Sequence, residues 1–268
     1  MKKFITLEKS VGETPLACME SWRETAGIDS VTPLTYAGRL DPMASGKLLV
    51  LIGDECKKKD EYLNLDKAYE FSVLIGIGSD THDVLGRLQT ATHIPTVTKQ
   101  RLTTITVDLV GEIELPYPHF SSKTVQGKPL HTWTLEDRLD EIDIPTKQST
   151  IYSLTLQRIE IKSRADVASE TLDKINTIPE VTDERKVIGN DFRRADVRKD
   201  WEDIKNNDSL PDTYQIAHFH CIASSGTYMR TLAKVIGEKS GTQGLAWSIH
   251  RPDIGKYRPA SQVWIQSF

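Results

Sequence analysis

Residues 36–53 read Tyr-Ala-Gly-Arg-Leu-Asp-Pro-Met-Ala-Ser-Gly-Lys-Leu-Leu-Val-Leu-Ile-Gly, a polar half followed by an apolar half. The apolar half leaves no polar face, so Lys47 to Ile52 is predicted to be a strand buried on both sides. The polar half is rich in glycine, proline and serine, which disfavour regular structure as far as Gly46. Asp41 is therefore expected on a loop that leads into a core strand, where a rigid scaffold can present a reactive side chain.

The pair Asp41-Pro42, taken alone, is more typical of a turn start than of a catalytic site. Arg230 changes this balance, because it lies in the first turn of the helix predicted within 224–237. A cation at that position opposes the helix macrodipole, at a cost of a few tenths of a kcal/mol to about 1 kcal/mol. A phosphate or a carboxylate nearby would offset the cost, although a solvent-facing arginine fits the sequence equally well.

Composition indicates a soluble globular protein. The chain has 268 residues, of which 38% are hydrophobic and 27% charged. No apolar run approaches the ~20 residues of a membrane span, and no signal peptide is evident. Three widely spaced cysteines, Cys18, Cys56 and Cys221, predict neither a disulfide framework nor a zinc site. We therefore expect a cytoplasmic protein without membrane association.

The net charge of −4 argues against nucleic-acid binding by the chain as a whole, but the charge is unevenly distributed. Lysines occupy 57–59, and a second basic cluster consists of Arg193, Arg194, Arg198 and Lys199. Each cluster is more typical of a solvated face than of a phosphate site. The second cluster lies in the segment 163–212, which is charged and poor in aromatics. We interpret this segment as a largely solvated insertion, with helices predicted at 164–175 and 191–204.

Two pairs of residues could ligate a metal, and neither pair has enough partners. Asp80 and Asp83 lie in a polar loop after the strand predicted from Ala68 to Ile77, and self-capping of the loop explains them better than calcium. His218 and His220 lie two apart on a predicted strand without a third ligand at suitable spacing. No metal site is predicted.

Several motifs, taken in order, resemble those of the TruB-type pseudouridine synthases, the tRNA pseudouridine-55 synthases. The resemblance covers most of residues 4–162 and 213–258. The motifs are Ala37-Gly-Arg-Leu-Asp-Pro-Met-Ala-Ser-Gly46, Asp66-Lys-Ala-Tyr69, Ser79-Asp-Thr-His-Asp-Val-Leu-Gly86, Ser121-Ser-Lys123 and Cys221 to Arg230, with a last core motif around Ile249. One such motif is modest evidence, whereas five in family order make chance matching improbable.

The resemblance implies a role for each matching residue. Asp41 would be the nucleophile, and Arg230 would pair with it and favour its ionised form. Tyr69 would stack on the flipped uracil and is a candidate acceptor of its C5 proton. The reaction breaks the bond from sugar C1′ to base N1, turns the base and reattaches it through C5, without a metal or nucleotide cofactor. The candidate substrate-binding residues are Tyr36, Arg39, Asp80, Lys123 and Ile249.

The chain departs from the family pattern at several points. Arg39 replaces a small or hydroxyl residue, and the 163–212 insertion interrupts the region before the arginine motif. Tyr36 stands where the family has a histidine that enters the RNA loop, although an aromatic ring could also stack on a base. Phe120 replaces a tyrosine. The chain ends soon after Gly255, so we expect the C-terminal RNA-binding domain of many members to be absent.

We therefore predict one α+β catalytic domain over residues 1–268, with the pseudouridine synthase fold and a mixed, largely antiparallel sheet flanked by helices. The predicted function is isomerisation of uridine in RNA, foremost at position 55 in the T-loop of tRNA. The alternatives are a synthase for ribosomal or another RNA, and a non-catalytic RNA-binding or RNA-folding protein on the same scaffold. The expected partner is RNA, chiefly tRNA, and the expected state is a monomer.

Overall fold

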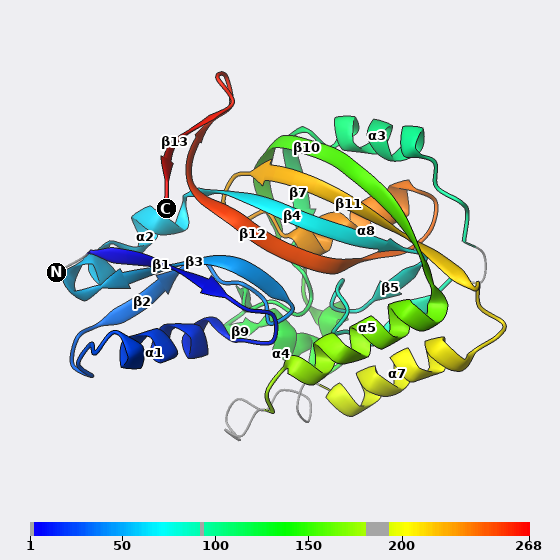
Figure 1. Cartoon of the computed structure of the whole chain (residues 1–268), viewed down its shortest axis with the longest axis horizontal. Coiled ribbons are helices and arrows are strands. Elements are labelled where there is room, and N and C mark those ends of the chain that lie inside the picture. The colour runs from blue at the N-terminus through cyan, green and yellow to red at the C-terminus, as the bar shows by residue number, and fades with distance from the viewer. Residues whose placement is uncertain (1–2, 92–93, 181–192) are drawn as a thin grey trace.

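The structure, a computed structural model, describes residues 3–91, 94–180 and 193–268 and is built around one nine-stranded sheet (Figure 1). The strands of this sheet are β1 (Phe4–Lys9), β2 (Leu34–Ala37), β3 (Ala44–Ile52), β4 (Asp66–Ile75), β7 (Gly111–Pro116), β10 (Thr146–Ser163), β11 (Thr213–Ala223), β12 (Gly244–Arg258) and β13 (Val263–Ser267). Two small pairs stand apart, β5 (Ile77–Ser79) with β6 (Leu88–Thr90), and β8 (Thr124–Val125) with β9 (Lys128–Pro129).

The helices lie between these strands in the chain. They are α1 (Pro15–Thr25), α2 (Lys59–Leu63), α3 (Lys99–Asp108), α4 (Leu130–Leu135), α5 (Arg164–Thr177), α7 (Arg194–Asn206) and α8 (Met229–Lys239), with 3-10 turns at η1 (Gly53–Lys58) and η2 (Leu139–Glu141). Figure 1 shows α8 behind β4 and β12, and α5 and α7 side by side below the sheet. None of the described helices is long and apolar enough to cross a membrane.

The sheet has the order β1-β3-β12-β4-β11-β10-β7, with β2 added to β3 and β13 added to β12. Its pairings are antiparallel except that β12 runs parallel to β3. The predicted α+β class with a mixed, largely antiparallel sheet is confirmed. This order brings three segments that are far apart in sequence together at the middle of the sheet: β3, β4 and β12.

The predicted start of the first core strand was wrong. β3 begins at Ala44, so Ser45 and Gly46 are strand residues and not loop residues. The reason is the parallel neighbour β12, which pairs Ala44 with Ile249 and Gly46 with Arg251. Gly46 has φ +110°, and a Cβ there would lie 2.4 Å from the Arg251 carbonyl oxygen. Glycine thus allows a close strand approach here, where the sequence alone indicated a turn.

The strand predicted from Ala68 to Ile77 is interrupted. β4 ends at Ile75, and β5 begins at Ile77. Gly76 between them has φ +98°, and its amide donates to the Gln243 carbonyl at 2.8 Å. The left-handed backbone at Gly76 redirects the chain into the 77–90 hairpin and the loop that it carries.

The predicted insertion does contain two helices, but its description as a solvated excursion was wrong. α5 and α7 supply buried side chains to the main core, and Trp201 on α7 is fully buried there. Its indole Nε1 donates to the Val84 carbonyl at 3.0 Å. The start of the second predicted helix, at 191–192, lies outside the described residues. A tryptophan in an otherwise charged segment was the available signal, since a tryptophan is large and usually mostly buried.

Candidate active site

Asp41 lies on the turn between β2 and β3. Its carbonyl accepts a hydrogen bond from the Ala44 amide at 2.9 Å, with Pro42 at the second turn position, as is common in type I and type II turns. Asp41 therefore begins a turn, as the Asp-Pro pair predicts, and this position also allows it to act as a reactive side chain. The side chain is 39% exposed, so a substrate could reach the carboxylate.

Arg230 lies in the first turn of α8 and is 5% exposed. Its Nε donates to Asp41 Oδ2 at 2.7 Å and its Nη2 donates to Asp41 Oδ1 at 3.3 Å, a two-pronged contact. Nη1 donates to the Thr81 carbonyl at 2.9 Å, and Nη2 also reaches the Phe120 carbonyl at 3.4 Å. The expected ion pair is thus present, and the anion that Arg230 requires is a carboxylate of the protein.

Asp83 is a second carboxylate beside this ion pair, and sequence reasoning did not assign it to the site. Its side chain is 5% exposed and its Oδ2 lies 3.7 Å from Arg230 Nε. The Thr81 hydroxyl and the Leu85 amide both donate to Asp83 Oδ1. Burial raises the pKa of Asp83 to about 6, although Arg230 and Thr81 oppose the shift. The two hydrogen bonds to Asp83 Oδ1 confirm the self-capping predicted for this loop.

The described residues hold no group of three or more His, Cys, Asp or Glu side chains that could bind a metal. His218 instead has its Nε2 3.0 Å from Glu160 Oε2.

Tyr69 and Ile249 lie on neighbouring strands at the centre of the sheet. Ile249 is 5% exposed and pairs with Phe71 on β4 and with Ala44 on β3. Tyr69 is partly buried against the same core. Burial raises the pKa of the Tyr69 hydroxyl, while the nearby Arg251 opposes the shift. The ring would therefore remain a neutral phenol at neutral pH.

Arg251 belongs to the last core motif of the family resemblance, which gave it no role in the site. It is 1% exposed, and its guanidinium donates to three carbonyls of the segment around Asp41. The distances are 2.9 Å to Lys47, 3.2 Å to Arg39 and 3.3 Å to Gly38. A buried cation that binds the backbone on both sides of Asp41 holds the turn in place. No local pattern could have predicted this role, because the partners of Arg251 lie about 200 residues earlier in the chain.

Tyr228 precedes α8 as its N-cap residue and is the third addition to the site. Burial raises the pKa of its hydroxyl, and the charge of Asp41 adds to the shift. Its ring meets that of Tyr117 edge-on, with centroids 5.5 Å apart. The sequence included Tyr228 in the motif from Cys221 to Arg230 without a role, and the ring contact depends on how the 116–123 segment folds back.

The other candidate substrate residues are dispersed. Arg39 is exposed, and exposed Lys123 has its Nζ 5.2 Å from the Tyr117 ring centroid. Tyr36 packs in a separate small cluster with Leu48 and Val50, under the Lys59 ammonium group. Arg39 and Lys123 are therefore accessible to an incoming ligand, and the Tyr36 ring is partly buried. A substrate-binding role for these three residues stays a prediction.

Asp80 is engaged by the protein itself. It accepts from the Arg87 amide at 2.9 Å and from both terminal nitrogens of Arg193. Arg194, the next residue of the predicted basic cluster, donates to the carbonyls of Ile178 and Pro179 at 2.7 Å. Half of that cluster is thus used inside the fold.

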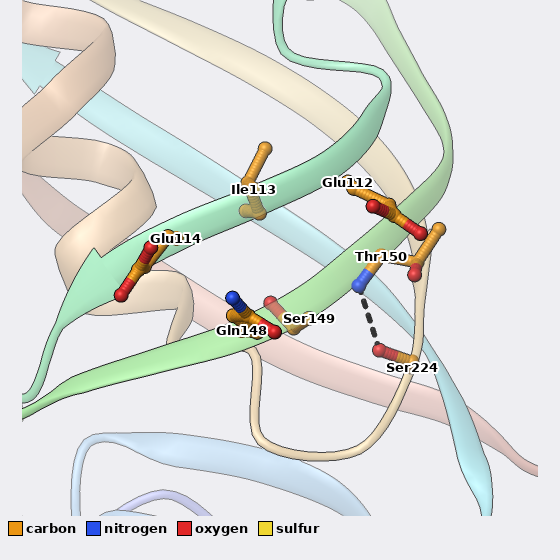
Figure 2. Close-up of a pocket in the computed structure, with 7 residues that line it drawn as sticks. All are labelled: Glu112, Ile113, Glu114, Gln148, Ser149, Thr150 and Ser224. Atoms are coloured by element: carbon orange, nitrogen blue, oxygen red, sulfur yellow. Dashed lines mark hydrogen bonds between the residues drawn. The ribbon is translucent and has the colours of Figure 1, made fainter.

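A polar pocket of about 370 Å³ lies elsewhere, between β7, β10 and the end of β11 (Figure 2). Its lining residues are Glu112, Ile113, Glu114, Gln148, Ser149, Thr150 and Ser224. The Thr150 amide donates to Ser224 Oγ at 2.8 Å across it. Two glutamates disfavour a phosphate there, and neither Asp41 nor Arg230 lines it, so this hollow is not the candidate active site.

Comparison with known proteins agrees with the family resemblance of the sequence motifs. Residues 28–172, over half of the chain, match the model of the TruB family pseudouridylate synthase (N terminal domain). The tRNA pseudouridine synthase B of Caldicellulosiruptor saccharolyticus is 32% identical over 156 residues, which cover 58% of this chain and 52% of that protein. The tRNA pseudouridine synthase 4 of Saccharomyces cerevisiae is 27% identical over 231 residues, which cover 78% and 57%. The chain thus spans about half the length of these curated relatives.

The fold has a counterpart among solved structures. A chain in the crystal structure of a Cbf5-Nop10-Gar1 complex superposes with a TM-score of 0.55 and 14% identity. The match covers 94% of this chain and 49% of that chain. At this identity the likeness concerns the fold alone.

Proposed function

This chain belongs to the TruB family of pseudouridylate synthases, and from that premise we propose that it isomerises uridine to pseudouridine in RNA. The proposed target is the uridine at position 55 in the T-loop of tRNA. The observation that carries the proposal is the ion pair of Asp41 with buried Arg230, with Tyr69 and Ile249 on the adjoining strands.

The ion pair supplies what a carboxylate nucleophile needs. Arg230 Nε, 2.7 Å from Asp41 Oδ2, fixes the orientation of the carboxylate, and the three carbonyls bound by Arg251 hold its turn. Asp41 attacks the target nucleotide as its C1′–N1 bond breaks, and the released uracil turns between Tyr69 and Ile249. C5 then bonds to C1′ as the bond between Asp41 and C1′ breaks and the carboxylate is released. The C5 proton leaves and N1 takes up a proton, so the reaction is an isomerisation.

The base must first leave its stack, which costs a few kcal/mol and favours a loop uridine over a paired one. Exposed Arg39 and Lys123 are our candidates for phosphate contacts during this step. Two relatives that bear the name tRNA pseudouridine synthase support tRNA as the substrate class. We further propose that the protein acts as a monomer in the cytoplasm, where its three unpaired cysteines would stay reduced.

The test is a set of transcripts. Purified protein is incubated with a tRNA transcript, with the same transcript carrying cytidine at position 55, and with a ribosomal RNA fragment. We expect pseudouridine in the first transcript alone. Modification of the ribosomal fragment alone would show that the substrate is ribosomal RNA and not tRNA. Tight binding without conversion of any RNA would indicate a non-catalytic RNA-binding protein.

Pseudouridine mapping in cellular RNA, with and without the gene, extends the test. We expect the loss of one modified T-loop position across several tRNAs. An unchanged map together with inactive protein in vitro would contradict the proposed function.

A further inference from the structure

The position of Arg230 depends on two peptide carbonyls besides Asp41. Nη1 donates to the Thr81 carbonyl at 2.9 Å, and Nη2 approaches the Phe120 carbonyl at 3.4 Å. These carbonyls belong to the loops at 79–86 and 116–123, which are separate in sequence. Where the two loops lie therefore decides where the guanidinium points, and hence how it meets Asp41.

Arg193 joins these two loops. Its terminal nitrogens bind both carboxylate oxygens of Asp80, with Nη2 3.2 Å from Oδ1, and Asp80 directly precedes Thr81. Its Cζ also lies 4.4 Å from the centroid of the Phe120 ring. One guanidinium thus contacts the neighbour of the first carbonyl and the residue that bears the second, through a bidentate ion pair and a cation–π contact.

The backbone conformation of Arg193 is unfavourable by itself. The residue has φ +58°, in the left-handed region that costs a non-glycine residue roughly 1–2 kcal/mol. It also caps the start of α7, where a cation opposes the macrodipole. Such strain persists only where surrounding contacts over-determine the conformation, and it concentrates near functional sites.

The rest of α7 anchors Arg193 against the same loop. The Trp201 indole donates to the Val84 carbonyl at 3.0 Å, and Asp200 accepts from Arg87 Nε at 2.7 Å and from the Leu88 amide at 3.0 Å. The helix therefore cannot shift without moving the 79–88 segment. Its start, and Arg193 with it, has a fixed place beside the site.

We propose that Arg193 is a positioning residue for the Asp41–Arg230 ion pair, acting by holding together the Asp80 and Phe120 loops whose carbonyls orient Arg230. The inference rests on the proposed function and extends it to a residue supplied by the 163–212 insertion. Arg193 acts through its two neighbours, and it touches neither Asp41 nor the reacting base.

The first test separates rate from binding. Arg193→Ala, Arg193→Lys and Glu202→Ala, a matched change at an exposed position of α7, are compared with wild type. We expect Arg193→Ala to lower the single-turnover rate at saturating tRNA by about 100-fold, as a displacement of roughly 1 Å can do. The tRNA Kd should change by less than about threefold. Lysine should restore part of the rate, because it keeps the charge but not the bidentate fork, and Glu202→Ala should match wild type.

Either of two results would overturn the proposal. If Arg193→Ala weakens the Kd and lowers its salt slope by ~1 while the saturated rate is unchanged, Arg193 is a phosphate contact. If only the melting temperature falls, with rate and Kd unchanged well below it, the residue serves stability alone.

A second measurement is independent of activity, so an inactive wild type would count against the proposed function and not against this inference. In a crystal structure of Arg193→Ala we expect the separation of Arg230 Nε from Asp41 Oδ2 to exceed the 2.7 Å of the wild type, with loss of the contact to the Phe120 carbonyl. An unchanged ion pair and unchanged loops would overturn the positioning role.

Discussion

The N-terminal ends of α8 and α7 each carry an unfavourably placed arginine, and in each case a carboxylate compensates its charge. Each carries an arginine against the helix macrodipole, Arg230 and Arg193 respectively. Each arginine meets a carboxylate that is remote in sequence, Asp41 at 189 positions and Asp80 at 113 positions. Both contacts use two guanidinium nitrogens, the geometry that arginine provides and lysine does not.

The two pairs differ in what surrounds them. The Arg230 side chain is 6% exposed while its partner Asp41 is 39% exposed, so a buried cation presents an accessible carboxylate. The Arg193 side chain is 20% exposed and Asp80 27%, and the Asp80 carboxylate also caps the Arg87 amide. An accessible carboxylate held by a buried cation suits chemistry, whereas a less exposed carboxylate that also accepts from a backbone amide suits support. This difference supports our proposals that the reaction takes place at the α8 start and that the α7 start has a positioning role.

The largest effect, and the largest difference between the two helix starts, is expected from Arg230→Gln. The change leaves Asp41 without its cation and leaves the buried Asp83 carboxylate beside a neutral group. The unfolding free energy should fall by about 3–5 kcal/mol where Asp83 is ionised, the cost of an uncompensated buried charge. The single-turnover rate should fall by about 10³-fold or more, beyond the loss for Arg193→Ala. Lys239→Gln, which removes an exposed charge from the same helix, is the control. A loss for Arg230→Gln smaller than that for Arg193→Ala would reverse the assignment.

The second carboxylate at the α8 start predicts a pH effect on stability. Burial raises the pKa of Asp83 to about 6 in the folded chain, above the ~3.9 of an unfolded aspartate. The folded state therefore binds more protons between these values, so the unfolding free energy falls as pH rises from ~4 to ~6 and the loss is complete above that.

Asp83→Asn removes this dependence. The unfolding free energy of the variant, relative to that of wild type, should rise by about 2 kcal/mol between pH 4 and pH 7, measured by urea unfolding. Its Oδ1 can still accept from Thr81 and Leu85, so the local hydrogen bonds persist. A gap between variant and wild type that stays constant with pH would contradict the raised pKa.

The attachment of α7 to its loop gives a smaller effect. Trp201→Phe keeps most of the buried ring but leaves the Val84 carbonyl without its indole donor. The unfolding free energy should fall by about 1–3 kcal/mol, the cost of an unsatisfied buried acceptor. Trp264→Phe on β13, a partly exposed position, should cost less than ~0.5 kcal/mol. Equal losses for the two variants would argue against a specific role for the Val84 contact.

The smallest effect is expected at Lys199, an exposed member of the predicted basic cluster. Neutralising it as Lys199→Gln should lower the salt slope of RNA binding by at most ~1 and leave the saturated rate unchanged. Arg193→Gln should show the opposite pattern, with a lower rate and an unchanged slope. A fall in rate for Lys199→Gln would remove the distinction between the solvated and the engaged parts of the cluster.

The Asp41–Arg230 pair could be predicted because two local signals pointed to it. A misplaced cation required an anion, and the surrounding motifs supplied a family order in which Asp41 was the partner. The same charge argument applies to Arg193, but its neighbours Arg194, Arg198 and Lys199 made a solvated face or a phosphate site the simpler interpretation. Only the tertiary fold identifies Asp80 as its anion.

The remaining differences share one cause, contacts that the chain makes across a long sequence separation. Ser45 and Gly46 have turn propensity, and the parallel pairing with β12 overrides it. Arg251 is one charged residue among many until its carbonyl partners are known. Trp201, by contrast, offered a usable signal, since a tryptophan in a charged segment indicates that one face of that segment is buried.

The central claim is that Asp41, held by Arg230, carries the reaction. Its most direct test is the single-turnover conversion of uridine to pseudouridine in a tRNA transcript by wild type and by Asp41→Asn. The amide has nearly the same shape but cannot act as an ionised nucleophile, so the variant should form no detectable pseudouridine. Its tRNA Kd should lie within about threefold of the wild-type value. Conversion by the variant at the wild-type rate would contradict the account.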